Sequence, residues 1–332
     1  MQLHEYRISN FSTQNGQALD ITLAYAIYGK LNAAKDNAIL IPTSYSATHE
    51  DAEDLVATTD SLNLSNECVI VINMLCNSAS SSPSNTPAPF DGPRFPFITV
   101  HDNVRAQHQL ITKELGIKKL RLVMGFSMGG LQTFEWGAQH SDMVDAILPI
   151  CGAARVSNHN WLFLEGAKKA LLADPAFNEG DYKSRPEAGM EAFATVYGGW
   201  VFSQDFFREE LFKDLGMEKT EDVINFMKDY FYRREANDLL GMLKTWQAAD
   251  ISKNPEFGGD FSSALGAIKT RAIIMPCKTD LYFRVADSEF EVSRMPNAEL
   301  RVIDSNLGHI AGGGMDPVGK TAIDLAIVEL LK

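Results

Sequence analysis

Short apolar runs recur along this 332-residue chain, and longer stretches of mixed polarity separate them. Apolar runs of this length are typical of buried strands. Helical or loop stretches lie between most of them, which predicts an α/β fold with a mainly parallel sheet covered by helices on both faces. The predicted strands are residues 21–28, 38–41, 68–72, 120–124, 146–151, 272–275 and 300–303.

The strand pattern is interrupted between residues 154 and 266, where apolar residues recur at helical spacing. We therefore expect two parts: an α/β core of residues 1–153 and 267–332, and an inserted helical cap of residues 154–266 over the carboxyl edge of the sheet. The helices predicted in this cap are residues 161–172, 186–197, 206–211, 222–231 and 237–248.

Two further segments of the core have sequence patterns that predict their local structure. Residues 102–115 form a predicted helix, with Asp102 as its cap and Gly116 at its end. Residues 76–96 are rich in both serine and proline. Because proline stiffens a chain, we interpret this segment as a structured flap and not as a flexible tether.

The strand at residues 120–124 runs directly into a Gly-x-Ser-x-Gly sequence centred on Ser127, and a helical pattern follows. In such a sharp strand-to-helix turn, glycines let the backbone pass where a Cβ would collide, and the serine hydroxyl is held above the sheet edge. The pattern predicts that Ser127 is a nucleophile. The alternative interpretation is a glycine-rich turn whose serine only caps the helix.

A nucleophilic serine needs a base for its proton and an acid that orients the base. His309 follows the last predicted strand and is the candidate base, with a surface-loop histidine as the alternative. Asp280 directly follows the strand at 272–275 and is the candidate acid. Asp287 is better explained by helix capping, and Asp304 by ordering of its own loop.

Candidates for the remaining parts of a site are less specific. The backbone N–H groups of Met128 and of the loop near Tyr45 are the candidate oxyanion-hole donors. Trp161 and Trp200 in the cap, together with Ile310, are candidates for the substrate pocket. Packing within the cap is the alternative for both tryptophans.

Composition narrows the classes of function. The net charge is −13 and the isoelectric point is near 5.0, which argues against nucleic acid or a membrane surface as a partner. The four cysteines are widely spaced, with no histidine arranged for zinc, so we expect reduced thiols and no metal site. The amino terminus lacks the pattern of a signal peptide, and we expect a cytoplasmic protein.

The chain resembles the homoserine O-acetyltransferase family of the α/β-hydrolase superfamily. The resemblance is carried by residues 24–32, 95–107, 125–130 and 152–155, by Gln132, Glu135 and Trp136, and by the pair Gly308-His309. It implies an α/β-hydrolase fold with a helical cap and a covalent acyl-serine intermediate. It also implies a triad of Ser127, Asp280 and His309.

The chain departs from that family where substrate is held. Family acetyltransferases carry an acidic residue directly after the Gly-His pair, but Ile310 stands here. They also tend to carry a cap arginine by a Thr-Tyr motif, but the corresponding stretch, residues 196–201, is uncharged. The oxyanion loop likewise reads Pro-Thr-Ser-Tyr at residues 42–45 in place of His-Ala-Leu-Thr. These differences predict poor binding of the zwitterion homoserine.

The favoured hypothesis is a serine hydrolase that passes its acyl group from Ser127 to water and needs no cofactor. One alternative is an O-acyltransferase with acetyl-CoA as co-substrate. Another is a catalytically silent protein that binds a small ligand under its cap. In each case the expected partner is a small molecule, with a homodimer as a further possibility.

Overall fold

Eight strands form one sheet in the computed structural model, which describes residues 2–58 and 61–332. The strand order is β1-β2-β4-β3-β5-β6-β7-β8. The β1–β2 and β2–β4 pairs are antiparallel, and the pairs from β4 to β8 are parallel, which confirms the predicted α/β fold. The strands are β1 (Gln2–Ser12), β2 (Ala18–Gly29), β3 (Ala38–Pro42), β4 (Cys68–Ile72), β5 (Leu122–Phe126), β6 (Ala146–Ile150), β7 (Arg271–Ile274) and β8 (Ala298–Leu300).

The edge strand β1 is absent from the sequence prediction. It pairs with β2 alone, and its exposed residues include Leu3. A strand with one face in water carries alternating polar residues and lacks the continuous apolar run of a buried strand. The predicted strands were found by that run, so this one was missed.

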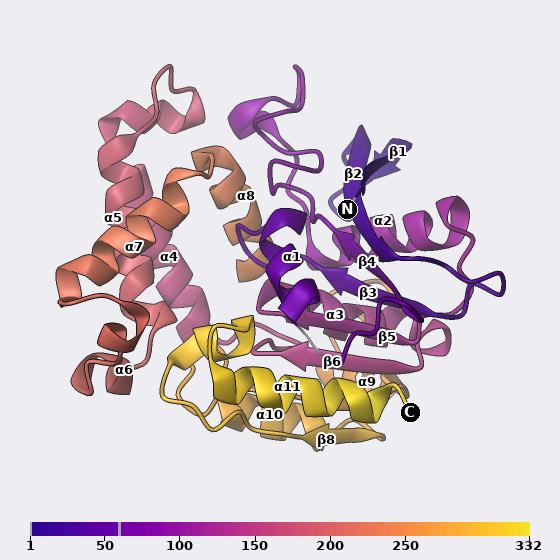
Figure 1. Cartoon of the computed structure of the whole chain (residues 1–332). Coiled ribbons are helices and arrows are strands. Elements are labelled where there is room, and N and C mark those ends of the chain that lie inside the picture. The colour runs from indigo at the N-terminus through magenta and orange to yellow at the C-terminus, as the bar shows by residue number, and fades with distance from the viewer. Residues whose placement is uncertain (1, 59–60) are drawn as a thin grey trace.

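Two layers of helices cover the sheet (Figure 1). Ile39, Val69 and Leu122 point from the central strands into one cluster with side chains of α1 and α11. The next residues along two of those strands, Leu40 and Val123, point to the other face, into the cluster that α2, α3 and α9 share. The helices of these layers are α1 (His49–Thr58), α2 (Val100–Gln109), α3 (Met128–Gln139), α9 (Phe261–Ala267) and α11 (Pro317–Leu330), while α10 (Val285–Val292) packs beside β8.

The remaining helices gather beyond the carboxyl ends of the parallel strands as a cap (Figure 1). They are α4 (Asn158–Leu172), α5 (Glu187–Val201), α6 (Gln204–Arg208), α7 (Thr220–Tyr232) and α8 (Ala236–Gln247). The chain returns to the core before residue 266, because α9, which begins at Phe261, packs against α3. No helix in the described part of the chain has the length and apolarity to cross a membrane.

One local prediction needs adjustment, and another agrees with the structure. Thr99, and not Asp102, is the N-cap of α2, because Asp102 occupies the third helical position and completes a capping box with Thr99. The segment at 76–96 is structured, as predicted. The hydroxyl groups of Ser78 and Ser84 donate hydrogen bonds of 2.8 and 2.6 Å to the carboxylate of Asp238 in α8, which ties this flap to the cap.

Candidate active site

Ser127 lies in the turn between β5 and α3 in a conformation that few non-glycine residues adopt, with φ 58° and ψ −122°. The turn is possible because its flanking residues lack a Cβ. A Cβ on Gly125 would lie 2.3 Å from the carbonyl carbon of Gly129, and one on Gly129 would lie 2.5 Å from the carbonyl oxygen of Pro42. The two glycines therefore let β5, α3 and the loop after β3 approach one another closely, with Ser127 at their junction.

His309 reaches Ser127 from the far end of the chain. It lies in the short helix η6 (Gly308–Gly313) and is 3% exposed. Its Nε2 lies 2.9 Å from Ser127 Oγ. The rings of Phe126 and Tyr282 pack against the imidazole, each at a centroid distance of 4.7 Å, so the ring has little freedom to turn away.

Asp280 holds the other side of the imidazole. The Nδ1 of His309 donates a 2.7 Å hydrogen bond to Oδ2 of Asp280. The Oδ1 atom accepts from the backbone N–H groups of Tyr282 and Phe283 at 2.7 and 3.2 Å. Because both carboxyl oxygens have partners, the acid is fixed in position and fixes the tautomer of the histidine in turn. The structure thus brings Ser127, His309 and Asp280 into one hydrogen-bonded chain.

The two alternative acids lie elsewhere. Asp304 has a side chain that is 82% exposed and pairs with Lys278 at 2.5 Å. Asp287 lies in the first turn of α10, whose N-cap residue is Arg284, so Asp287 is not the cap. Neither carboxyl group bonds to His309 in the described part of the chain.

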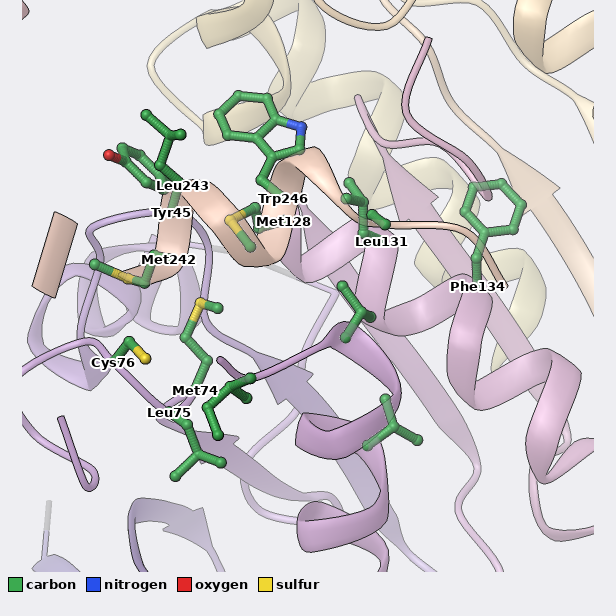
Figure 2. Packing of buried hydrophobic residues seen from close by; sticks show 14 of the residues in the cluster. Tyr45, Met74, Leu75, Cys76, Met128, Leu131, Phe134, Met242, Leu243 and Trp246 are labelled. Carbon is green, nitrogen blue, oxygen red and sulfur yellow. The ribbon is translucent and has the colours of Figure 1, made fainter. Parts of the chain in front are cut away.

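Met128 and Tyr45 have buried side chains and backbones beside Ser127. Both side chains belong to the hydrophobic cluster between the sheet and α8, where they lie close to Trp246 (Figure 2). The Tyr45 hydroxyl also donates a 3.1 Å hydrogen bond to the carbonyl of Leu239 in α8. As the first residue of α3, Met128 has an N–H group without a carbonyl partner inside the helix. These anchored side chains hold two backbone segments next to the serine.

A pocket of about 200 Å³ opens above Ser127 and His309. Its apolar wall comes from the cap helices α5 and α7 and from η6. Among the described residues that line it, none carries a carboxylate, an ammonium or a guanidinium group. The lining residues are Ser44, Tyr45, Ser46, Phe126, Ser127, Tyr197, Val201, Phe202, Phe226, Met227, Tyr230, His309, Ile310, Gly313 and Met315.

Of the three residues predicted for the pocket, Ile310 lines it and the two tryptophans do not. Trp161 is 43% exposed on α4. Trp200 packs against His159 and Phe163 inside the cap, at centroid distances of 4.9 and 5.1 Å. The prediction for Trp161 and Trp200 is therefore corrected. Helical periodicity indicates which residues share a face, but not which element that face covers.

The cap residues that do line the pocket, among them Phe226, Met227 and Tyr230, were missed for the same reason. Their helix α7 has a clear apolar face in the sequence. That face packs partly on α5 and partly over the site. Only the packing of the cap shows which residues of this face contact α5 and which line the pocket.

Cys151 places a third polar atom beside the acid and the base. Its Sγ and one ligand atom each of Asp280 and His309 lie within 4.8 Å of one another. Burial, together with the neighbouring Asp280 charge, raises the pKa of the Cys151 thiol well above its usual value. A metal binds the thiolate and not the protonated thiol, and the Nδ1–Oδ2 hydrogen bond occupies the other two side chains. These three residues therefore form a poor metal site.

The family described as the alpha/beta hydrolase fold matches residues 58–312. The fold and the nucleophile-elbow turn agree with that match, and the chain belongs to the α/β-hydrolase family. It is an enzyme of that fold, and its relatives include esterases and homoserine acyltransferases.

The first group consists of esterases. The chain is 40% identical over 313 residues to an ethyl acetate hydrolase of Pseudomonas veronii. The aligned region covers 93% of this chain and 89% of that protein. The crystal structure of the acetyl esterase MekB superimposes with a TM-score of 0.95 at 38% identity, over 100% of this chain and 97% of that one.

The second group consists of homoserine acyltransferases. A homoserine O-acetyltransferase of Chlorobium chlorochromatii is 27% identical over 317 residues, which covers 91% of this chain and 88% of that protein. The resemblance inferred from the sequence is thereby confirmed.

Proposed function

We propose that this protein is a carboxylesterase that hydrolyses small, uncharged esters through an acyl intermediate on Ser127. The observation that carries the proposal is the hydrogen-bonded chain of Ser127, His309 and Asp280 at the base of a small pocket without charged lining residues. An uncharged lining favours an uncharged substrate, because a buried ionic group without a partner is costly.

In the proposed reaction, the Ser127 hydroxyl attacks the ester carbonyl while His309 Nε2 takes its proton. Asp280 stabilises the imidazolium that forms. The backbone N–H groups of Met128 and Tyr45 donate hydrogen bonds to the developing oxyanion. The C–O bond to the alcohol then breaks, and the alcohol leaves with the proton from His309. A water molecule, deprotonated by His309, then attacks the acyl-serine. The bond between the acyl carbon and Ser127 Oγ breaks, His309 returns the proton to Oγ, and the carboxylic acid is released.

The names of the relatives support this choice over acyl transfer. The ethyl acetate hydrolase and the acetyl esterase match nearly the whole chain at 38–40% identity, whereas the homoserine O-acetyltransferase matches at 27%. The pocket also offers no acidic or basic side chain for an amino-acid acceptor. We therefore propose water as the natural acceptor and esters of short acids and alcohols as the substrate class.

The proposed chemistry needs the ester and water alone, so the proposal includes no cofactor. It also places the enzyme in the cytoplasm. That location is supported by the four cysteines, which are all free and buried, because reducing compartments keep thiols unpaired. Cell fractionation with detection of the protein in each fraction tests the location.

The function is tested by incubating the purified protein with ethyl acetate and phenyl acetate and measuring acid release, with the Ser127→Ala variant as the control. Rapid quenching and intact-mass measurement then show whether an acyl group is attached, and peptide mapping shows whether it lies on Ser127. Turnover that the Ser127→Ala variant lacks supports the proposal. Equal acid release by both proteins contradicts it.

A further inference from the structure

A second, larger cavity adjoins the pocket. This outer groove has a volume of about 520 Å³ and lies along the loop after β3 and the start of α1. Residues that line the groove and not the pocket include Thr48, Asp51 and Ala52. The residues that line both cavities are Ser44, Phe126, Tyr230, Gly313 and Met315. The pocket and the groove therefore share one wall.

Tyr230 is the residue of that shared wall that comes from the cap, since the other four belong to the core. Its hydroxyl lies 3.0 Å from the Ser46 hydroxyl, at the oxyanion loop of the core. The side chain thus extends from α7 across to the core, at the boundary between pocket and groove.

A second residue of the cap holds the Tyr230 ring in place. The guanidinium of Arg234 lies 5.6 Å from the centre of that ring. Arg234 in turn donates hydrogen bonds of 3.0 and 2.9 Å to the two carboxylate oxygens of Asp51 in α1. Both hydrogen bonds come from the single nitrogen Nη2, and they tie the guanidinium to α1. The ring is therefore fixed at its hydroxyl and on its face.

We propose that Tyr230 is a specificity-determining residue, whose ring closes the pocket toward the outer groove and so limits the length of the substrate chain. The inference rests on the proposed esterase function. A short chain lies within the pocket, and a longer chain that extends toward the groove meets the ring, because Tyr230 lines both cavities. Removal of the ring joins the two cavities and provides that space.

The experiment compares three variants with the wild type. Tyr230→Ala removes the ring, and Tyr230→Phe keeps the ring but removes the bond to Ser46. Tyr232→Ala is the matched control, because Tyr232 is an exposed aromatic residue of α7 that lines neither cavity. Two ester series are used: ethyl acetate against ethyl hexanoate, and ethyl acetate against hexyl acetate. The readout is the ratio of kcat/KM for the long ester to that for the short ester.

Tyr230→Ala is expected to raise this ratio at least about tenfold in one of the series, because each methylene that a pocket accepts or rejects changes kcat/KM by about tenfold or more. The responding series shows whether the acyl or the alcohol chain meets the ring. Tyr230→Phe and Tyr232→Ala are expected to stay within about threefold of the wild-type ratio.

Three results overturn the inference: unchanged ratios in Tyr230→Ala, an equal rise in Tyr232→Ala, or an equal rise in Tyr230→Phe. Hydrolysis of ethyl acetate by each variant shows that it is folded. Tyr230→Leu replaces Tyr230→Ala if the alanine variant does not fold. If the wild type hydrolyses ethyl acetate but Tyr230→Ala leaves both kcat/KM ratios unchanged, this inference alone is overturned. A wild type that hydrolyses no ester overturns the proposed function as well.

Discussion

His309 Nε2 lies 2.9 Å from Ser127 Oγ, although 182 residues separate the two in the chain. The distance and the buried position of both side chains are those of a base poised to take the serine proton. The pair leads directly to a prediction about reactivity.

If His309 activates Ser127, a fluorophosphonate is expected to modify Ser127 and no other serine. The His309→Ala variant is expected to lose most of this labelling. Ser127→Ala is expected to lower kcat by about four to six orders of magnitude, as removal of a triad serine does in other enzymes. Peptide mapping by mass spectrometry and ester turnover are the measurements. Labelling at another serine would contradict the assignment of the nucleophile.

The acid is tested by a comparison of two aspartates. Asp280→Asn is expected to lower kcat by about 10⁴-fold with little effect on folding, because the amide cannot hold the imidazole in the required tautomer. Asp304→Asn is the matched control, since Asp304 is exposed and pairs with Lys278. Its effect on kcat is expected to be small. A larger loss of kcat in Asp304→Asn than in Asp280→Asn would show that Asp304, and not Asp280, is the acid of the triad.

The third prediction concerns the acyl acceptor. Charge-assisted hydrogen bonds contribute about 1.5 to 3 kcal/mol each, and the described pocket lining offers no charged side chain to the amine or carboxylate of homoserine. With acetyl-CoA and millimolar homoserine together in one tube, little O-acetylhomoserine is expected above the uncatalysed background. Product analysis by mass spectrometry measures it against free acetate. If O-acetylhomoserine is the main product, the enzyme is an acetyltransferase and not a hydrolase.

The fourth prediction concerns the pH dependence of stability. Glu291 in α10 is buried, and its Oε1 accepts a 2.7 Å hydrogen bond from the N–H of Ala154, where the chain leaves the sheet for the cap. Burial raises the pKa of Glu291 from 4.5 to about 8. Between these values the folded protein keeps a proton that the unfolded chain releases, so the free energy of unfolding falls as the pH rises.

Glu291→Gln mimics the protonated carboxyl group and is expected to remove this dependence. The variant is expected to be more stable than the wild type at pH 8, by about 1 to 3 kcal/mol, and close to it at pH 5. Urea unfolding at both pH values measures the difference. Glu289→Gln, at an exposed position in the same helix, is the control. A difference that does not change with pH would show that Glu291 is already ionised in the folded protein.

The fifth prediction concerns the tight turn at Ser127 between β5 and α3. In Gly129→Ala the new Cβ would lie 2.5 Å from the carbonyl oxygen of Pro42, a backbone atom that cannot give way as cheaply as the end of a flexible side chain. The variant is expected to lose several kcal/mol of stability and most of its activity. In Gly166→Ala, on the exposed side of α4, the Cβ meets no atom within 4 Å. That control is expected to gain about 0.5 to 1 kcal/mol, because alanine is the better helix former. Thermal unfolding of both variants tests the pair.

The sequence alone determined the order of strands β2 to β8 along the chain and the position of the turn at Ser127. A short apolar run that ends in Gly-x-Ser-x-Gly specifies a strand, a tight turn and a helix through local steric constraints, and these need no distant partner. The placement of Ser127 therefore followed from its neighbours in the chain. The change from strand to helical periodicity after residue 153 likewise predicted the cap, because periodicity depends only on residues that are near one another in the chain.

Only the tertiary structure decided which residues surround the serine. The edge strand β1 forms because β2 offers it a partner, and its own residues show no buried run. Trp161 and Trp200 are large aromatic residues of the kind that often line a substrate pocket, but they lie outside it. Phe226 and Tyr230 of α7 line the pocket instead. The contacts that place Tyr230 come from Ser46 and Arg234, and Arg234 is held by Asp51 across the cap–core boundary. A helix shows its apolar face in the sequence, but what that face covers depends on packing between segments far apart in the chain.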